Sequence, residues 1–344
     1  MTTSPSTRHG AAIPTDVRTG IPAGPRTLPL RLSYVLPIRC EVPADGPEAA
    51  DFDAYLRRLA DWVDDVIVVD GSPDEVHAVH ARRWAGLVRH VRPDAALADP
   101  PDKPCGVVTG ARLARHDVVV VGDDDVRWGP SQLVEALRRM DGLDLLRPHN
   151  RFDPAPWHAR WDTGRMLLNR AAGGDWPGTL VVRRDALCRG YRSGVLFENL
   201  ELVRTVAAGG GRIGVARDLV VVRRPPEAGW FVRQRVRQAY DEWARPIRLA
   251  WQLALLPVAV LGGRRSVVGL AAGAVAIAEV GRRRGGTKAF PATAPLWAPL
   301  WLAERAVCSW LAVGARARGG VRYRGRRMAV AATPSRHLRR RARA

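Results

Sequence analysis

Residues 118–128 read VVVVGDDDVRW, so three consecutive aspartates follow directly on a run of four valines. Strands buried on both faces of a parallel sheet read as nearly continuous apolar runs. The valines therefore predict an inner strand that carries Asp123, Asp124 and Asp125 to the carboxyl edge of the sheet, where such sheets bind ligands. The alternative is a solvated acidic turn or a helix N-cap, because Pro130 opens a helix shortly afterwards.

The sequence on both sides of this stretch alternates short aliphatic runs with amphipathic segments. Phe52, Leu56, Leu59 and Val63, for example, recur at helical spacing between two such runs. This alternation predicts an α/β fold with a mostly parallel sheet covered by helices on both faces. The expected strands are 32–37, 66–69, 87–91, 118–121, 143–146, 179–183 and 213–223, and the expected helices are 52–65, 74–85, 104–115, 131–140, 199–208 and 231–244.

The chain has a formal net charge of +20, and arginine supplies nearly all of the positive charge because Lys103 and Lys288 are the only lysines. A basic balance favours anionic partners such as phosphates, nucleic acid or acidic lipid headgroups. The richness in Ala, Gly and Arg also fits a biased genome, so the net charge alone does not identify the partner. The distribution of the charge along the chain has to decide among these anionic partners. The four widely separated cysteines predict neither a zinc site nor a disulfide framework.

The aspartate triplet predicts a metal site. Neighbouring carboxylates repel one another unless a cation neutralises them. Mg²⁺ and Mn²⁺ bind carboxylate oxygens together with substrate phosphates. Asp123 and Asp125, which alternate in the chain, can turn toward one ion and are the predicted metal ligands.

Other polar residues are expected at the same edge of the sheet. Asp70 follows the second strand, Pro37 and Arg39 end the first, and Lys103 precedes a helix whose start would lie near a phosphate. Each has a simpler explanation, since Asp70-Gly71 is a favourable turn and Lys103 fits an ordinary surface charge. Their agreement on one edge favours a shared site.

The order of these motifs resembles the nucleotide-sugar-binding half of family-2 glycosyltransferases with the GT-A fold. The matching motifs are VVDGSPD at 68–74, K-x-x-x-V-x-x-G-A-x-x-A from Lys103 and the aspartate triplet. The resemblance continues through GGDWPGT at 173–179, FENLEL at 197–202 and QRVRQ at 234–238, and it spans about residues 31–330. It implies metal-dependent, inverting transfer of a sugar from a nucleoside diphosphate to an acceptor hydroxyl.

Carried over by position, the resemblance implies a role for each candidate residue. Asp70 would contact the nucleoside, Asp123 the ribose or diphosphate, and Asp125 the metal. The implied donor-binding residues are Pro37, Arg39, Asp70, Lys103, Asp123, Asp124, Gln234 and Arg237, and the implied acceptor-binding residues are Asp175, Trp176 and Glu201.

The acceptor hydroxyl must lose its proton to a positioned carboxylate. Family members commonly carry a Glu-Asp pair with the aspartate as base, whereas this chain reads Glu198-Asn199. An amide cannot accept the proton in that way, so Glu198 is the predicted base and Glu201, one helical turn further on, is the alternative. Both also fit the surface charges of an amphipathic helix.

Residues 234–238, QRVRQ, resemble the Q-x-x-R-W element of lipid-acceptor members such as those like ceramide glucosyltransferase, with Gln238 in place of the tryptophan. The guanidinium fork of Arg237 suits a diphosphate. A basic helix face at a membrane surface is the alternative.

The C-terminal third predicts membrane association. Residues 247–261 and 267–280 are nearly uncharged but shorter than the ~20 residues of a comfortable span, and 291–313 is longer. Trp297, Trp301 and Trp310 favour a membrane interface, and the flanking arginines favour anionic lipid. A spanning hairpin with Arg264 and Arg265 at its tip, interfacial helices and a buried helical subdomain all remain possible.

These observations divide the chain into a disordered leader without a secretory signal (1–29), a nucleotide-sugar-binding half (30–147), an acceptor-binding half (148–245), apolar membrane-associated helices (246–313) and a basic tail (314–344). The expected partners are a nucleoside diphosphate sugar, a lipid or glycan acceptor and anionic membrane lipid, at the cytoplasmic face of the cell membrane. The dispersed arginines and the acidic centre argue against nucleic acid. A nucleotidyltransferase and an inactive lipid- or nucleic-acid-binding protein are the competing functions.

Overall fold

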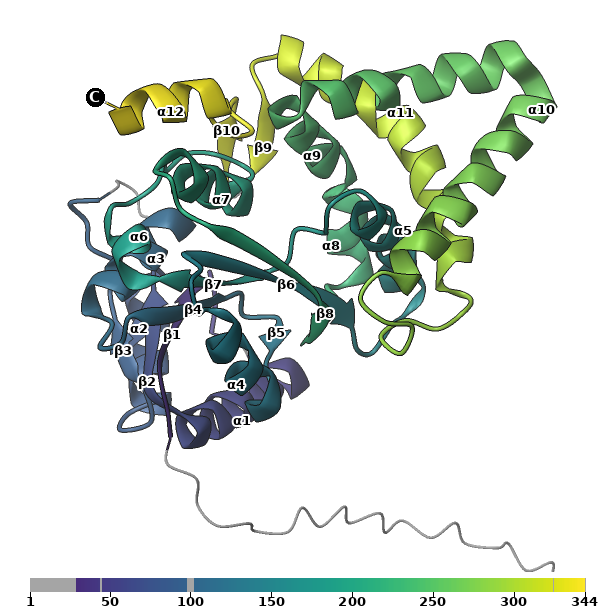
Figure 1. Cartoon of the computed structure of the whole chain (residues 1–344). Coiled ribbons are helices and arrows are strands. Elements are labelled where there is room, and N and C mark those ends of the chain that lie inside the picture. The colour runs from purple at the N-terminus through teal and green to yellow at the C-terminus, as the bar shows by residue number, and fades with distance from the viewer. Residues whose placement is uncertain (1–28, 44, 98–101, 324, 344) are drawn as a thin grey trace, which may run out of the picture.

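The computed structural model describes residues 29–43, 45–97, 102–323 and 325–343. Its centre is an eight-stranded sheet in the order β3-β2-β1-β4-β7-β6-β8-β5, with helices on both faces (Figure 1), which confirms the predicted α/β class. The predicted leader lies outside the described residues except for Pro29. The strands are β1 (Leu30–Ile38), β2 (Val63–Asp70), β3 (Arg89–Val91), β4 (Val118–Gly122), β5 (Val126–Arg127), β6 (Leu145–Phe152), β7 (Thr179–Arg183) and β8 (Ile213–Arg223).

The helices form two groups. Those around the sheet are α1 (Pro47–Trp62), α2 (Asp74–Arg83), α3 (Lys103–Leu113), α4 (Pro130–Arg139), α6 (Arg184–Cys188) and α7 (Glu198–Ala208). A second group gathers beside the sheet (Figure 1): α5 (Trp157–Ala171), α8 (Ala228–Arg233), α9 (Arg235–Tyr240), the 3-10 helix η1 (Asp241–Ala244), α10 (Pro246–Arg283), the 3-10 helix η2 (Ala294–Trp297) and α11 (Ala298–Ala317). The chain ends with the hairpin β9 (Val321–Tyr323) and β10 (Arg326–Met328) and with α12 (Ser335–Arg343).

The inner strands are apolar throughout because their two faces meet two different clusters. Val118 and Val120 belong to one cluster with residues of α1 and α4. Val119 and Val121 belong to the other, with residues of α3, α6 and α7. The four valines are therefore an inner strand, as predicted, and the aspartates emerge where burial ends.

The sheet is mixed, so the predicted mostly parallel arrangement is only partly right. β1 pairs in parallel with β2 and β4, and β6 pairs in parallel with β8. β7, however, is antiparallel to both β4 and β6. The connecting helix α5 packs against α10 and α11 instead of crossing a face of the sheet, so β7 re-enters the sheet from the end at which β6 leaves it.

Two predicted elements have different limits in the structure. The strand expected to end at Leu146 continues to Phe152, and a register shift between Arg147 and His149 accommodates Pro148. The single helix expected over 231–244 is divided into α8, α9 and η1. Proline is a strong local signal for a strand end, and the tertiary pairing with β8 overrides it.

Two glycines let α3 approach β1 closely. A Cβ on Gly110 would lie 2.4 Å from Cγ1 of the buried Val35, and one on Gly106 would lie 3.0 Å from Cβ of Pro37. Side chains at these two positions would push the helix away from the sheet. The close approach determines where Lys103, the first residue of α3, meets the sheet edge.

The C-terminal region only partly matches the membrane prediction. α10 is long and apolar enough to cross a membrane and is largely exposed, but it bends at Gly263, where φ is 57°. Trp301 was expected at a membrane interface, and this is wrong, because α11 packs against α5, α9 and α10 and leaves Trp301 only 2% exposed. The predicted basic tail in part returns to the sheet domain, where Leu196 N and Phe197 N donate hydrogen bonds to the carbonyls of Val330 and Ala331.

Gly110→Ala should destabilise the protein. Alanine gains about 1 kcal/mol in helix propensity, but overpacking a buried contact costs about 1–3 kcal/mol, and the clash with Val35 favours the upper part of that range. We expect the free energy of unfolding in urea to fall by about 1–2 kcal/mol. Gly314→Ala is the control, since nothing lies within 4 Å of a Cβ there. Equal effects in both variants would contradict the close approach.

Candidate active site

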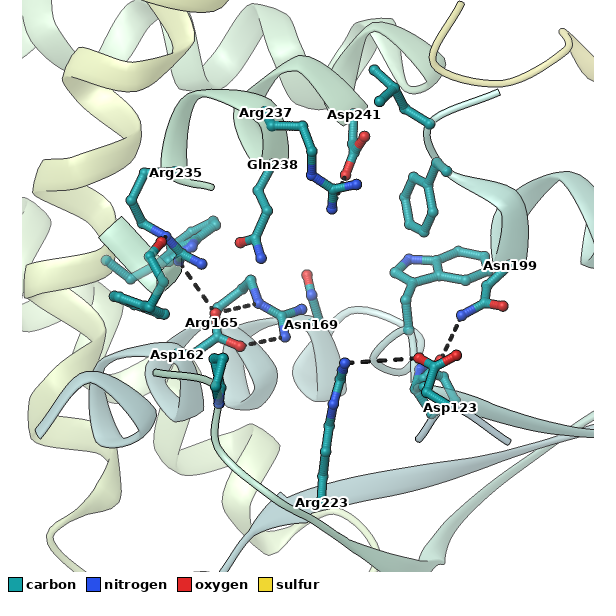
Figure 2. A pocket seen from close by; sticks show the side chains of 18 of the residues that line it. Asp123, Asp162, Arg165, Asn169, Asn199, Arg223, Arg235, Arg237, Gln238 and Asp241 are labelled. Atoms are coloured by element: carbon teal, nitrogen blue, oxygen red, sulfur yellow. Dashed lines mark hydrogen bonds and ion pairs between the residues drawn. The ribbon is translucent and has the colours of Figure 1, made fainter. Parts of the chain in front are cut away.

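The carboxyl ends of β1, β2 and β4 meet at one edge of the sheet, as predicted. Ile38 is paired with Asp70 and Val35 with Val121, so both predicted acidic segments reach this edge. A cavity of about 220 Å³ opens there, bordered by residues of α5, α7, α9 and α11 (Figure 2). The predicted site residues that line it are Asp123, Asp125, Trp176, Glu198 and Arg237.

Lys103 joins the aspartate triplet to Glu198. Its Nζ lies 2.6 Å from Asp123 Oδ1 and 2.9 Å from Glu198 Oε1. Burial alone would lower the pKa of Lys103, but the two carboxylates outweigh it and hold that pKa above its ordinary value. Burial likewise raises the pKa of Glu198, and Lys103 outweighs this and holds it below its ordinary value. Lys103 and Glu198 are therefore both charged at neutral pH.

Arg223, at the end of β8, contacts the same triplet from the other side. Its Nε lies 2.8 Å from Asp125 Oδ2, and its Nη2 lies 3.8 Å from Asp123 Oδ2 (Figure 2). Asp124 is exposed and does not line the cavity. The alternate aspartates thus share Arg223 as a cationic partner, as expected for residues that turn toward one ligand.

Asp123 and Asp125 fit a hard divalent cation. Oδ1 of Asp125 is buried without a hydrogen-bond partner. Burial raises the pKa of Asp125 to about 6, although Arg223 acts in the opposite direction. A carboxylate oxygen so placed lacks a positive partner, and carboxylate oxygens are the ligands that Mg²⁺ and Mn²⁺ prefer.

Gly178 positions Asp123 through a backbone hydrogen bond and by leaving space for its carboxylate. A Cβ on Gly178 would lie 2.7 Å from Asp123 Oδ2. The Gly178 carbonyl accepts a hydrogen bond of 2.9 Å from Asp123 N, and Asn150 Oδ1 accepts one of 2.8 Å from Gly178 N. The segment GGDWPGT therefore supplies backbone contacts to the triplet, and a side chain at position 178 would displace the Asp123 carboxylate.

Asp70 is fully buried, and its side chain does not line the cavity. Asp70 Oδ2 lies 2.8 Å from His80 Nδ1 and 3.0 Å from His90 Nε2. Asp70, His77 and His90 also offer three potential metal-ligand atoms within 4.8 Å of one another. A test of metal binding must therefore separate this cluster from the aspartate triplet.

Of the other residues predicted to bind the donor, some line the cavity and others do not. Arg39 forms an ion pair of 3.0 Å with Glu41, and Pro37 packs below Gly106. Neither they nor Gln234 line the cavity, whereas Arg237 does. Gln234 Oε1 is buried without a hydrogen-bond partner.

The residues predicted to bind the acceptor separate in space. Trp176 lines the cavity and packs edge-on against Phe197 at 5.2 Å between ring centroids. Asp175 is buried beneath it and accepts hydrogen bonds from Arg165 and Asn169, both at 2.7 Å. Glu201 lies outside the cavity lining, and its Oε2 accepts a hydrogen bond of 2.6 Å from Thr333 N.

The structure adds residues to the cavity that the sequence did not single out. They are Asp162, Arg165 and Asn169 from α5, Arg223 from β8 and Asp241 from η1 (Figure 2). No spacing motif marks the three residues of α5, because this helix reaches the site only by packing beside the sheet. Asp241 alone had a local signal, being one helical turn beyond Arg237.

No protein-family profile and no curated protein matches the sequence. The structure is similar to a mannosyltransferase from Pyrobaculum calidifontis in complex with GDP-Man and Mn²⁺, with a TM-score of 0.50 and 21% identity, covering 83% of this chain and 88% of that chain. Glucosyl-3-phosphoglycerate synthase from Mycobacterium tuberculosis (20% identity, 59% and 76% covered) and mannosyl-3-phosphoglycerate synthase from Rubrobacter xylanophilus (19%, 59% and 70%) are less similar, each with a TM-score of 0.39. The first likeness shows that the fold is GT-A-like.

Lys103→Met should destabilise the fold in a pH-dependent way. It leaves two partly buried carboxylates without their shared partner, which costs about 1–3 kcal/mol of unfolding free energy at pH 7. Because the folded-state pKa of Glu198 is lowered, its stabilising contribution is present above about pH 4.3 and is lost as the pH falls through the lowered value. Urea unfolding should thus show a smaller difference from wild type at about pH 3.5 than at pH 7.

Lys288→Met is the matched control for this variant, because Lys288 is the other lysine of the chain and is exposed. It should leave the unfolding free energy unchanged at both pH values. A pH-independent loss in Lys103→Met would contradict the proposed charge pairing.

Proposed function

We propose that the protein is a metal-dependent glycosyltransferase that moves a sugar from a nucleoside diphosphate to an acceptor hydroxyl with inversion. The observation that carries this proposal is the pair Asp123 and Asp125 at the carboxyl edge of the sheet, with Lys103 and Arg223 on either side and the cavity in front. The similar mannosyltransferase was solved with GDP-Man and Mn²⁺, which supports a donor of the same chemical class.

The positions of the charged side chains suit stabilisation of a leaving diphosphate. As the bond between the sugar and the diphosphate breaks, the leaving diphosphate gains negative charge, and Mg²⁺ or Mn²⁺ held by Asp123 and Asp125 would stabilise it as a Lewis acid. Lys103, Arg223 and Arg237 add fixed positive charge at the edge. The Asp70 side chain is buried, so Asp70 is proposed to support the part of the sheet edge that binds the nucleoside. Trp176 is proposed to contact the acceptor.

A nucleotidyltransferase would use the same metal and a nucleotide. Enzymes of that kind usually carry a glycine-rich basic loop after the first strand, and residues 39–43, RCEVP, do not provide one. The cavity's aromatic wall, which includes Trp176, Phe197 and Tyr323, favours a sugar or another bulky acceptor over a second phosphate.

We also propose that α10 attaches the enzyme to the cytoplasmic face of a membrane, where a lipid-linked or envelope glycan hydroxyl would be accessible. Around the bend, Val260 is 70% and Leu261 87% exposed. Arg264 and Arg265 follow after two glycines and are exposed too. At ~1.5 Å per residue, the arms 246–262 and 264–283 are about 25–30 Å long, close to the hydrocarbon thickness. Apolar side chains beside arginines suit an anionic lipid surface.

Asp125→Asn should abolish metal-dependent donor binding, because it removes a charged ligand from the proposed metal. A thermal-shift assay with UDP and GDP, with and without Mn²⁺, would measure the loss. Asp124→Asn is the matched control and should keep at least half of the wild-type shift, since Asp124 is exposed and does not line the cavity. His90→Ala tests whether the cluster at Asp70 binds the ion instead. Equal losses in Asp124→Asn and Asp125→Asn would overturn the assignment.

Val260→Asp combined with Leu261→Asp should weaken membrane binding. Burying an aliphatic side chain contributes about 1.5–3 kcal/mol, so losing two should reduce cosedimentation with phosphatidylglycerol-containing vesicles at least ~10-fold. The control is Val134→Asp on α4, where the valine is 51% exposed on the sheet domain. Unchanged cosedimentation of the double variant would refute the attachment through α10.

A further inference from the structure

The residue that takes the proton from the acceptor is the missing part of the proposed reaction. The family position for this base holds Asn199, whose Nδ2 donates a hydrogen bond of 2.8 Å to Pro177 O. Glu201 is outside the cavity lining, with one oxygen bonded to Thr333 N. Neither residue can serve the cavity as a base.

Glu198 lines the cavity but lies on the donor side. Lys103 bridges it to Asp123 with contacts of 2.9 and 2.6 Å, so Glu198 is fixed next to the proposed metal ligands. Inverting transfer requires the acceptor oxygen to approach the anomeric carbon from the side opposite the leaving diphosphate. A carboxylate tied to the metal-binding aspartate therefore faces the leaving group and not the incoming hydroxyl.

Two more carboxylates of the cavity are already neutralised. Asp162 accepts two hydrogen bonds of 2.9 Å from Arg165. Glu242 pairs with Arg245 at 2.8 Å and with Arg248 at 3.5 Å. Arg165 outweighs burial and holds the pKa of Asp162 below its ordinary range, which makes Asp162 a poor proton acceptor, and Glu242 is occupied by two arginines.

Asp241 differs from Glu198, Asp162 and Glu242 because neither of its carboxylate oxygens lies within hydrogen-bond distance of a cation. It opens η1, is 8% exposed and lines the cavity. Its Oδ1 is buried without a hydrogen-bond partner, and its Oδ2 lies 3.6 Å from Nη2 of Arg237, beyond hydrogen-bond distance. Figure 2 shows its side chain pointing into the cavity from the wall opposite Asp123 and Arg223. An acceptor hydroxyl bound across a donor sugar would meet this carboxylate.

The charges around Asp241 suit a base. The facing groups are Arg237 and Arg245, which favour its anion, and Glu198 and Glu242, which disfavour it. Burial is the largest influence and, with the two glutamates, raises the pKa of Asp241 to about 6. A general base is most effective when its pKa is close to the working pH.

We propose, on the basis of the function proposed above, that Asp241 is the catalytic base in place of the family aspartate. The acceptor hydroxyl gives its proton to the Asp241 carboxylate while its oxygen forms the new bond to the anomeric carbon. The bond from that carbon to the diphosphate oxygen breaks, and its electron pair leaves with the diphosphate. Asp241 then releases the proton to solvent, so no further reactant is needed.

Asp241→Asn is the direct test, in the full chain with Mn²⁺ and with GDP-Man and UDP-Glc as probe donors and water as the acceptor. We expect donor hydrolysis to fall about 10²–10⁴-fold. The Mn²⁺-dependent thermal shift with GDP or UDP should stay at the wild-type value. At a Mn²⁺ concentration that saturates the site and so keeps Asp125 ionised, the wild-type kcat/KM should decrease as the pH falls below about 6, because protonated Asp241 cannot accept a proton, and this limb should disappear from the residual activity of the variant.

Glu198→Gln is the comparison variant and should retain the acidic limb of the pH profile. Formate should partly restore hydrolysis in Asp241→Ala, which a merely structural role of Asp241 would not allow. Hydrolysis by Asp241→Asn within about threefold of wild type, or loss of the acidic limb in Glu198→Gln instead, would overturn the assignment while leaving the proposed function intact. A wild-type chain that shows no metal-dependent binding of GDP or UDP would overturn the proposed function itself.

Discussion

Repulsion between Asp123 and Asp125 at the end of a buried strand is the constraint on which the site depends. Two carboxylates at the edge of a low-dielectric core repel strongly unless cations stand close to them. Lys103 at the start of α3 and Arg223 at the end of β8 lie beside them. The positions of both cations depend on the assembled sheet, because α3 packs against β1 and β8 pairs with β6. The fold is thus coupled to the charge balance of its own active site.

The same constraint explains why small residues surround the triplet. Gly106 and Gly110 let α3 approach β1, which brings Lys103 to the edge, and Gly178 leaves room for the Asp123 carboxylate. At each of these positions a larger side chain would collide with a neighbouring residue, so the absence of a side chain allows the close contact. The motif spacing on α3 and the segment GGDWPGT are therefore geometric requirements of one charged centre.

Much of the sheet was predictable, because hydrophobic period and strand composition are local signals. The strands at 179–183 and 213–223 occur with the predicted limits, and the four valines are buried on both faces. The direction of β7 was not predictable, since it depends on α5 packing beside the sheet. Arg223 and Asp162 were missed for a related reason: a charged residue at a strand end or on a helix looks the same in sequence whether it faces a cavity or solvent.

The sequence by itself determined the α/β class, the acidic edge after β4 and the place of Lys103 at the start of a helix. Each of these follows from residues close together in the chain, where composition and period act directly on the backbone. Only the tertiary structure decided which carboxylate is tied to Lys103, which is hydrogen-bonded to arginine and which lies in the cavity beyond hydrogen-bond distance of its nearest arginine. Glu198 and Asp241 are chemically alike in sequence, and they differ only because burial and the neighbouring charges, brought together by folding, act on each of them differently.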